Sequence, residues 1–441
     1  MKKIKLYQII AVLMLAINCL HPQHLYTQTN IQIKNDHFKI IGLNDDFNVN
    51  YKGDIKVADD DKSIRSISSG GYIEIEKRTF GNSRRLNIYP NSEGKIIYEY
   101  EEGSKKVNFE PEGRKWMEEI LPDIIRNSGI DIEGRVNRFY SKGGVKAVLN
   151  EIESIGSDFI SAKYFKVLIG NLKLNENEYK QAISAVPEMV SSDFERSNIF
   201  QQSRDIYINS NSLTEAYLSA VSKISSDFEK ARVLKSLRID SFNEIQLNNY
   251  LITTNSINSD FEKSNVIKYM LSKQLLNETT FFSAVRVTDN IRSDFEKSNC
   301  FRLMLSKSPN EKVLAEIFRA VSRMSSDFEK GNILRNASDK IKPGTPSIEP
   351  LFDAINSMSS DFEHANVLKS LIRSANGDEA MYINILRSAA DISSDFEKSN
   401  VLTLAASRMP RTDKVNDEYV KAAKTINSSF EFGNVMKAFH K

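Results

Sequence analysis

The sequence predicts an α+β protein that is mostly α, with a small N-terminal antiparallel β domain followed by an α-solenoid of about nine 34-residue helix–turn–helix repeats. Three observations predict this fold. A phrase of the type Ile-Ser-Ser-Asp-Phe-Glu-Lys recurs at regular intervals through residues 156–441. Apolar residues precede each phrase at helical spacing, whereas several segments of residues 38–110 alternate apolar and polar residues with a period of two.

The composition is that of a folded protein with more than one core. The chain has 441 residues, of which 40% are hydrophobic and 27% charged. The formal net charge is +2, and subtracting the three lysines of residues 1–28 leaves −1 for the rest. A nearly neutral chain lacks the basic surface that a dedicated nucleic-acid-binding protein needs, so we expect no nucleic-acid partner.

Residues 1–28 have the features of a signal peptide. Three lysines precede an apolar run from about Leu6 to Leu20, which has the length of a signal-peptide core and is short for a bilayer span. We therefore expect the protein in the periplasm, at the cell surface or secreted. An uncleaved membrane anchor is the alternative.

The chain has only two cysteines, Cys19 and Cys300. Cys19 ends the stretch Leu-Ala-Ile-Asn-Cys, which loosely resembles a bacterial lipoprotein cleavage site, and lipidation there is the only membrane attachment that we expect. The alternative is cleavage near Gln28, after which Cys300 would be the only thiol and no intramolecular disulfide could form. We interpret Cys300 as a small buried hydrophobic residue rather than as a nucleophile.

Residues 29–110 are predicted to form the strand-rich domain. Period-two alternation occurs in 53–57, 72–78, 84–89 and 105–110. Turn-forming residues separate these segments at 58–62, 68–71, 80–83, 91–94 and 101–104.

Residues 111–155 are predicted to form a helical bridge between the β domain and the first repeat. Pro111 begins a helix that Gly129 ends, and two further helical patterns cover 131–140 and 144–155. Trp116, the only tryptophan, is expected to pack at this junction.

The solenoid is predicted for residues 156–441 from the spacing of one phenylalanine in each phrase. These phenylalanines are Phe159, Phe194, Phe228, Phe261, Phe295, Phe328, Phe362, Phe396 and Phe430. Nine copies at steps of 33–35 residues predict stacked helical hairpins, similar in length to tetratricopeptide or HEAT repeats. The Trp-Leu-Gly-Tyr pattern of tetratricopeptide repeats is absent.

Each phrase is predicted to begin the second helix of its repeat. In Ser226-Asp227-Phe228-Glu229 the serine would cap the helix, and the glutamate would reach back to the serine N–H to complete a capping box. Asp227 would complement the helix dipole. The first copy has Ile160 in place of the glutamate and the last has Ser429 in place of the aspartate, as is typical of terminal repeats.

The residues that follow the phenylalanine indicate how the helices pack. We expect a buried ring, followed three positions later by a small residue that lets a neighbouring helix approach. That position holds Ala162, Ser197, Ala231, Ser264, Ser298, Gly331, Ala365, Ser399 and Gly433.

The fourth position after the phenylalanine is asparagine in seven repeats. These residues are Asn198, Asn265, Asn299, Asn332, Asn366, Asn400 and Asn434. Asparagine is a mediocre helix former, so its recurrence needs a local reason. We interpret it as a polar ladder in which each amide bonds the backbone of the adjacent repeat, and a row of ligand-binding amides is the alternative.

The segment before each phrase is predicted to be the partner helix of the hairpin. Residues 214–224 and 313–324 place their apolar residues mainly on one face. Turn-forming stretches separate the hairpins at 174–178, 308–311, 342–350 and 375–379.

No catalytic, cofactor-binding or metal-ligating set of residues is expected. The five histidines are His21, His24, His37, His364 and His440, and no two of them have the one-turn spacing of a zinc peptidase. The stretch Asp59–Lys62 could attract calcium, but it lacks the glycine and the spaced glutamate of a calcium loop and is interpreted as an exposed turn. The repeated Asp and Glu lack the asymmetric environments that acid–base catalysis requires.

Several segments in this order resemble a group of uncharacterised exported bacterial α-solenoid proteins whose repeats carry Ser-Asp-Tyr/Phe-Glu-Lys/Arg at helix starts. The segments are GGYIEIEK, RRLNIY, FEPEGRKWMEEILPDIIRNSGI, GRVNRFYSKGGVKAVLNEI and the SDFEK units. Similar regions are fused in some bacteria to membrane zinc peptidases of the β-lactam-sensor type. The resemblance implies an extracytoplasmic sensing or docking module. The peptidase part is lacking, so the resemblance implies no proteolytic activity.

Three functional hypotheses follow. The first is an exported, non-enzymatic scaffold that binds a protein or peptide partner through the solenoid surface. The second is a sensory or regulatory module of the cell envelope, related to a membrane signalling peptidase. The third is a hydrolase with its site between the β domain and the solenoid, for which a cleft near residues 110–160 is expected.

Overall fold

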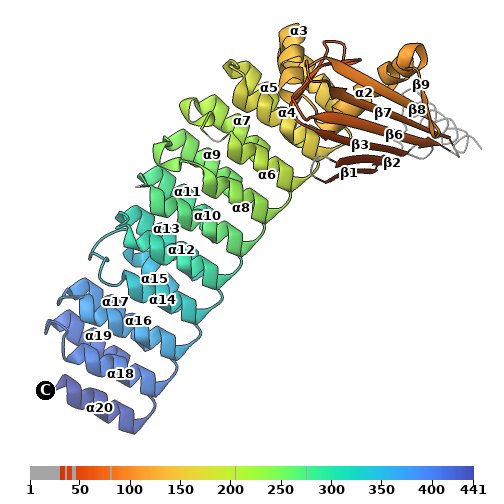
Figure 1. Cartoon of the computed structure of the whole chain (residues 1–441). Coiled ribbons are helices and arrows are strands. Elements are labelled where there is room, and N and C mark those ends of the chain that lie inside the picture. The colour runs from red at the N-terminus through yellow and green to blue at the C-terminus, as the bar shows by residue number, and fades with distance from the viewer. Residues whose placement is uncertain (1–29, 35–36, 42–45, 80–81, 204, 275) are drawn as a thin grey trace, which may run out of the picture. The chain divides into compact units, whose positions relative to one another are not determined.

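The computed structural model has the predicted α+β architecture, with an antiparallel β region followed by a repeated helical array (Figure 1). It describes residues 30–34, 37–41, 46–79, 82–203, 205–274 and 276–441. The chain divides into a first compact unit that ends at Leu172 and a second that covers Lys173–Lys441. The signal segment 1–28 and Cys19 lie outside the described residues. In the part of the chain that is described, no helix is both long and apolar enough to cross a bilayer.

An antiparallel sheet with strand order β1-β2-β3-β6-β7-β8-β9 forms the first layer of the first unit. Its strands are β1 (Asn30–Lys34), β2 (His37–Ile41), β3 (Asp46–Lys52), β6 (Tyr72–Thr79), β7 (Asn82–Pro90), β8 (Ile96–Glu102) and β9 (Lys105–Val107). A separate hairpin joins β4 (Ile55–Val57) to β5 (Ile64–Ile67). The period-two segments predicted at 72–78 and 84–89 are the central strands β6 and β7. The segment 105–110 is a strand only as far as Val107.

The sheet buries one face against a helix of the bridge. In the β6–β7 pair, Ile73 lies opposite Ile88 and Ile75 opposite Leu86, and all four side chains are fully buried. Trp116 of the bridge helix belongs to the same core, and its ring centroid lies 5.7 Å from that of Tyr100 in β8. Trp116 therefore packs where the bridge meets the sheet.

The predicted bridge, residues 111–155, is a short turn, η1 (Phe109–Gly113), and two helices, α2 (Arg114–Ser128) and α3 (Ile132–Glu153). The next helix, α4 (Asp158–Asn171), also belongs to the first unit. Gly129 ends α2 with a φ of 77°, as the sequence predicts. The two helical patterns at 131–140 and 144–155 form one element, α3, which is kinked at Gly143 and Gly144. The first copy of the phrase begins α4, within the first unit.

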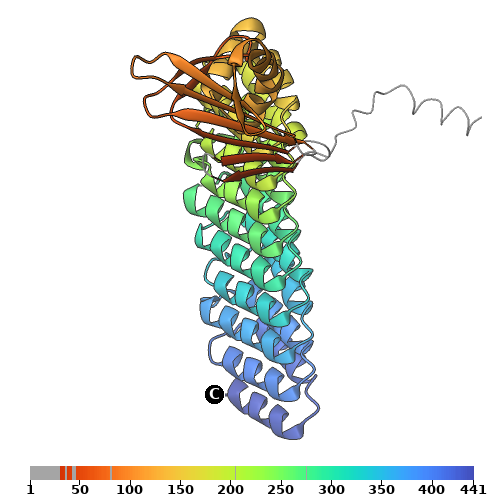
Figure 2. The ribbon, with the colours of Figure 1, turned by 45° about the vertical axis from the view of Figure 1, so that its right-hand side comes forward.

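The second unit stacks eight helical hairpins in two layers over its described residues (Figures 1 and 2). The A layer contains α5 (Glu176–Met189), α7 (Asn211–Ser222), α9 (Glu244–Asn255), α11 (Glu278–Asp289), α13 (Glu311–Ser322), α15 (Ile348–Asn356), α17 (Glu379–Ala390) and α19 (Asp413–Ala423). The B layer contains α6 (Asp193–Gln202), α8 (Asp227–Ser236), α10 (Asp260–Lys273), α12 (Asp294–Ser306), α14 (Asp327–Ala337), α16 (Asp361–Ser374), α18 (Asp395–Ala406) and α20 (Ser429–Phe439). Short turns η2 (Tyr207–Asn209) and η3 (Ile239–Ser241) lie between hairpins.

Small residues bring consecutive B helices close together, as predicted. The Ser264 Oγ and Cys300 Sγ atoms of neighbouring repeats lie 3.4 Å apart. A Cβ atom on Gly331 would lie 2.6 Å from an Oε atom of Glu363 in the next repeat. Cys300 is fully buried, and burial raises the pKa of its thiol to about 11, so it is a protonated core residue as expected.

In the second unit each phrase caps its own helix, and all but the last also contact the elbow of the next repeat, by which we mean the turn that joins an A helix to its B helix. The first phrase, in the first unit, makes no such cap with Ser157. The Asp227 carboxylate accepts a hydrogen bond of 2.7 Å from the Ser259 N–H in the following repeat. The same bond links the phrases of seven consecutive pairs. The donors of the others are Ser226, Ser293, Ser326, Ser360, Ser394 and Ser428, and the acceptors are Asp193, Asp260, Asp294, Asp327, Asp361 and Asp395.

The capping-box prediction is therefore half right. The serine does cap its helix, because Ser226 Oγ accepts a hydrogen bond from the Glu229 N–H at 3.3 Å, and the other B helices of the second unit repeat this contact. The glutamate carboxylate does not accept the predicted hydrogen bond from the serine N–H. That N–H donates to the aspartate of the preceding repeat, whose carboxylate already occupies the helix N-terminus.

In three phrases the lysine contacts the other side of the same elbow. Lys230 is buried, and its Nζ donates to the carbonyl and hydroxyl oxygens of Ser256, both at 3.2 Å, at the C-terminus of α9. Lys330 and Lys398 contact Ser357 and Thr425 in the same way. One phrase thus places a carboxylate at a helix N-terminus and an ammonium at a helix C-terminus of the next repeat. We call this arrangement the elbow clamp.

We predict that Asp294→Ala lowers the free energy of unfolding by about 1.5–3 kcal/mol, because it removes a charged acceptor from two backbone N–H groups, those of Ser325 and Ser326. Urea unfolding followed by circular dichroism measures the loss. Asp339→Ala is the matched control, because the Asp339 side chain is 73% exposed. Equal losses in the two variants would show that the elbow clamp contributes no stability.

We also predict a pH dependence that comes from His364, which replaces the lysine in one elbow clamp and lies 2.8 Å from Ser388 Oγ. Burial lowers the pKa of His364 below its ordinary value of 6.5. The unfolded chain then binds a proton near pH 6.5 while the folded chain does not, so stability is full above pH 6.5 and is lost as the pH falls. The loss is at most about 1.4 kcal/mol for each pH unit below 6.5, until the folded pKa is reached.

Urea unfolding at pH 7.5, 6.5 and 5.5 tests this prediction. His364→Lys should remove this part of the pH dependence, whereas substitution of the exposed His440 by Gln should leave the profile unchanged. A profile that is the same in wild type and His364→Lys would contradict the assignment.

Candidate interaction surface

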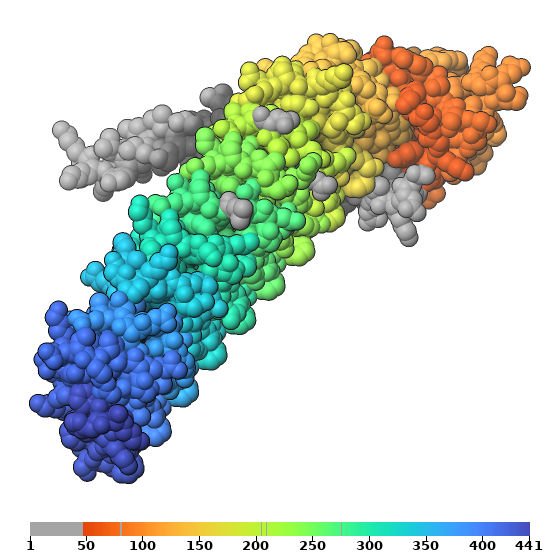
Figure 3. All heavy atoms as spheres, turned by 90° about the vertical axis from the view of Figure 1, so that its left-hand side faces the viewer, coloured from red at the N-terminus to blue at the C-terminus, as the bar shows by residue number. Residues whose placement is uncertain are grey.

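The phenylalanines of the phrase lie on the outside of the B layer, which corrects the prediction that their rings are buried. Their exposed fractions range from 54% at Phe194 to 72% at Phe430 in the second unit, and Phe159 of the first unit is 43% exposed. We call the eight in the second unit the Phe row: Phe194, Phe228, Phe261, Phe295, Phe328, Phe362, Phe396 and Phe430. Each lies in the first turn of a B helix, and the hairpins that carry them follow one another from yellow-green to blue in Figure 3.

Helical periodicity explains why these rings face outward. The buried residues of a B helix lie two, three, five and six positions after the phenylalanine, as with Lys230, Ala231, Val233 and Leu234 in α8. At about 100° per residue these positions share one side of the helix. The phenylalanine and the fourth residue after it lie on the opposite side. The apolar pair therefore forms the core, and the aromatic ring does not.

The asparagines lie on the same outer face, and the backbone ladder predicted for them is wrong. Three of them accept hydrogen bonds from arginine side chains: Asn198 from Arg232, Asn299 from Arg302 and Asn332 from Arg335. In the described part of the chain, no hydrogen bond is made by the side chains of Asn265, Asn366, Asn400 or Asn434. The amides therefore hold no backbone of the adjacent repeat.

The charged residues on this face pair with one another between repeats. The glutamate of a phrase contacts a basic residue in the preceding B helix, as in Lys268–Glu296 at 3.5 Å and Arg335–Glu363 at 2.5 Å. Arg232 crosses to the preceding repeat, where its guanidinium lies 5.3 Å from the centroid of the Phe194 ring. The outer face of the B layer thus combines exposed rings, amides and neutralised charges.

The A layer carries a second ladder that sequence reasoning missed. The N-cap residue of one A helix donates to the first glutamate of the preceding A helix, as in Asn277–Glu244 at 2.8 Å and Asn310–Glu278 at 2.6 Å. Ser210–Glu176 and Ser347–Glu311 repeat the contact at 3.1 and 2.6 Å. The sequence pattern that could have predicted this ladder is the recurrent Asn-Glu or Ser-Glu at the starts of A helices.

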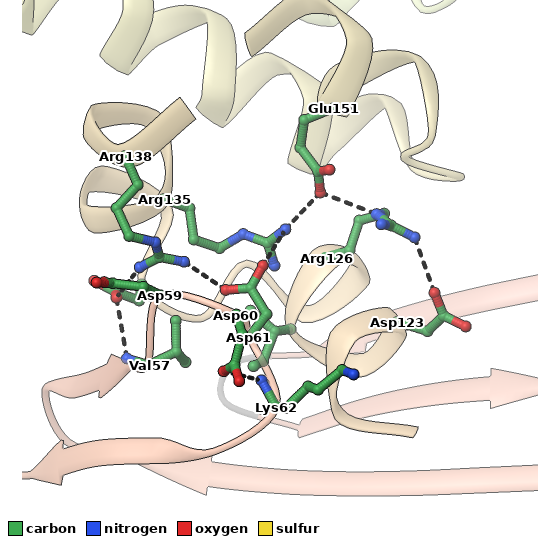
Figure 4. A network of polar contacts seen from close by, with 12 residues as sticks. Val57, Asp59, Asp60, Asp61, Lys62, Asp123, Arg126, Arg135, Arg138 and Glu151 are labelled. Carbon is green, nitrogen blue, oxygen red and sulfur yellow. Dashed lines mark hydrogen bonds and ion pairs between the residues drawn. The ribbon is translucent and has the colours of Figure 1, made fainter. Parts of the chain in front are cut away.

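A second cluster of polar residues lies inside the first unit (Figure 4). The Arg135 side chain is 1% exposed and contacts Glu151 at 2.5 Å and Asp61 at 3.1 Å. Arg126 approaches the same Glu151 oxygen at 2.9 Å, and Arg138 pairs with Asp61. Three arginines from α2 and α3 therefore surround two carboxylates, one of which comes from the turn between β4 and β5.

Burial sets the electrostatics of this cluster. Burial raises the pKa of Asp61 above its ordinary value, while Arg135 and Arg138 act in the opposite direction. Tyr164 of α4 is fully buried beside the cluster, and burial raises the pKa of its hydroxyl. Each carboxylate is shared by two guanidinium groups. The arrangement ties the β4–β5 turn to α2 and α3.

The stretch Asp59–Lys62 is an exposed turn only in part. Asp59 and Asp60 are exposed, whereas the Asp61 side chain is 13% exposed and pairs with arginines. Asp131 contacts the neighbouring strand, accepting a hydrogen bond of 3.1 Å from the Val57 N–H. A Cβ atom on Gly134 would collide with the Asp131 carboxylate, so a larger residue there would displace Asp131 from this position.

The hydrolase hypothesis predicts a cleft near residues 110–160. Residues of this region line a pocket of about 310 Å³ within the first unit. Asp131, Glu133 and Arg138 line it together with Lys56 and Asp59. Of these groups, Asp131 already contacts Lys56 and Arg138, at 3.4 and 3.6 Å. Among the described residues, no group of three or more His, Cys, Asp or Glu side chains is placed to hold a metal ion.

The fold and this surface define a helical repeat protein, an α-solenoid preceded by a small antiparallel β region. In comparisons with known proteins, no family model matches the chain and no curated protein sequence matches it.

We predict that Arg135→Leu lowers the free energy of unfolding by about 3–5 kcal/mol, because it leaves a buried carboxylate pair short of one cation. Arg114→Leu removes an ion pair whose partners are 41% and 53% exposed, and it should cost less than about 1 kcal/mol. Thermal and urea unfolding of both variants measures the difference. Similar losses in the two variants would rule out a special role for the buried cluster.

Proposed function

We propose that the protein is an exported, non-enzymatic scaffold that binds another protein or a peptide through the outer face of the B layer. The observation that carries this proposal is the Phe row, eight rings that are each more than half exposed. At about 200 Å² per ring, their exposed surface totals about 960 Å². Single exposed apolar residues are normal on a protein surface, but these eight occupy the same helix position in consecutive repeats and so form one line along the B layer.

The regularity of the row also supports binding over a structural role. The rings contribute little to the core, which consists of the apolar pairs and small residues of the B helices. Exposed apolar residues are a liability for solubility, so eight at equivalent positions need a reason outside the stability of the fold. The proposed location outside the cytoplasm rests on residues 1–28 of the sequence.

The double variant Phe295→Ser/Phe328→Ser tests the proposal in two adjacent repeats. Because both rings are about 60% exposed, its free energy of unfolding should lie within about 0.5 kcal/mol per substitution of wild type. Its capture of partners from an envelope fraction should fall at least tenfold, as quantified by mass spectrometry. Ile245→Ser/Ile252→Ser is the matched control, because these A-layer residues are 57% and 69% exposed.

A photo-crosslinking experiment makes the test site-specific. Replacing Phe295 with p-benzoylphenylalanine should yield crosslinked partners, and the same replacement at Ile252 should not. Equal capture by the double variant and wild type, or equal crosslinking from both positions, would refute the proposed function. A large loss of stability in the double variant would show that the rings belong to the core.

A further inference from the structure

The asparagines form a row of amides beside the Phe row, and the two rows together indicate what the surface binds. Each asparagine lies four residues after a ring, one helical turn away on the same face, so amide and ring are about 5–6 Å apart at their Cβ atoms. The pair occurs in seven repeats, in six of them within the consecutive array from α10 to α20.

These amides are available for bonding outside the molecule. Among the described residues, the side chains of Asn265, Asn366, Asn400 and Asn434 make no hydrogen bond, and the Asn198 and Asn299 bonds use only the amide oxygen. Asparagine costs roughly half a kcal/mol or more in a helix relative to alanine. The amides make few hydrogen bonds within the fold that would offset this cost. Their recurrence therefore indicates that they bind a partner.

A side-chain amide matches the main chain of a polypeptide. Its NH₂ group donates to a backbone carbonyl, and its oxygen accepts from a backbone N–H. The charged residues nearby pair with each other, as in Lys235–Glu262 at 3.6 Å and Lys268–Glu296 at 3.5 Å. The face is therefore close to neutral, which complements an uncharged peptide backbone with apolar side chains better than an anionic polymer.

The dimensions fit an extended chain. Adjacent packed helices lie about 8–10 Å apart, so the eight rings span about 60–70 Å. An extended polypeptide of about 20 residues covers this length at about 3.3 Å per residue. The exposed ring surface of about 960 Å² is enough to supply the roughly 800 Å² that each partner buries in a stable protein interface.

We propose that the Phe row and the asparagines bind an extended, apolar-rich polypeptide segment, with the rings packing on its side chains and the amides bonding its main chain. This inference rests on the proposed function and specifies the chemistry of the partner. Because the ring–amide pair recurs along the array, affinity increases with the length of extended chain that is engaged.

The test uses the full exported chain and an unfolded probe, fluorescein-labelled lysozyme that has been reduced and carboxymethylated. Fluorescence anisotropy compares its binding with that of native labelled lysozyme. The main variant is Asn265→Ala/Asn366→Ala/Asn400→Ala, which replaces unbonded amides with a better helix former and so should not lower the melting temperature. The matched control is Gln181→Ala/Ser184→Ala/Ser219→Ala, which removes exposed polar groups from the A layer.

We expect the unfolded probe to bind at least tenfold more tightly than native lysozyme. The asparagine variant should weaken this binding at least tenfold, and the control should leave it unchanged. Binding by the asparagine variant equal to that of wild type would overturn the inference.

Sedimentation velocity separates the failure of this inference from that of the proposed function. If the unfolded probe does not bind and the wild type forms a dimer that Phe295→Ser/Phe328→Ser dissociates, the occupant of the surface is a second copy. That result overturns the inference and leaves the proposed function standing. If the phenylalanine variant equals wild type in both assays, the proposed function fails as well.

Discussion

The stacked hairpins depend on the elbow clamp, in which one phrase neutralises both helix ends at the elbow of the next repeat. Asp227 caps the N-terminus of α10 through Ser259, and Lys230 caps the C-terminus of α9 through Ser256. A helix leaves N–H groups free at its start and carbonyls free at its end, with partial charges of opposite sign. Because these groups are half-buried between repeats, a carboxylate and an ammonium from the neighbouring repeat satisfy them where water has limited access.

The elbow clamp also explains which positions of the B helix are left exposed and so can bind a partner. Serine, aspartate and lysine of the phrase are used in the joint, and the small residue and apolar pair that follow are used in the core. The remaining positions of the B helix, those of the phenylalanine and asparagine, face solvent. Because the same aspartate–serine bond joins seven consecutive pairs of repeats, these positions align from one repeat to the next and form rows rather than isolated spots.

In the first unit, a single buried network of charged residues joins elements from distant parts of the chain. Arg135, Asp61 and Glu151 hold a β turn against two helices, just as the elbow clamp holds one hairpin against the next. In both places a polar residue is buried where elements from distant parts of the chain meet. The network occurs once, so the sequence shows no period that would draw attention to it, and Asp61 was predicted to be part of an exposed turn.

Much of the architecture could be predicted because it rests on local rules. The repeat length, the helix starts at each serine, the strands β6 and β7 and the end of α2 at Gly129 follow from periodicity, capping and backbone preference. The buried state of Cys300 follows from its place in the apolar pair. The outward position of Phe295 could also have been predicted, because the apolar pair five and six residues later defines the opposite side of the helix.

By itself the sequence determined the repeating hairpin, since neighbouring residues decide where a helix begins, which side of it is apolar and where it ends. Only the tertiary structure decided which polar groups meet across repeats, such as Asp227 and Ser259, which are 32 positions apart. Local spacing carries no information about such a bond, because its geometry depends on how two helices pack. For the same reason, only the packing of two repeats decided that the Asn198 amide bonds the side chain of Arg232, which is 34 positions away.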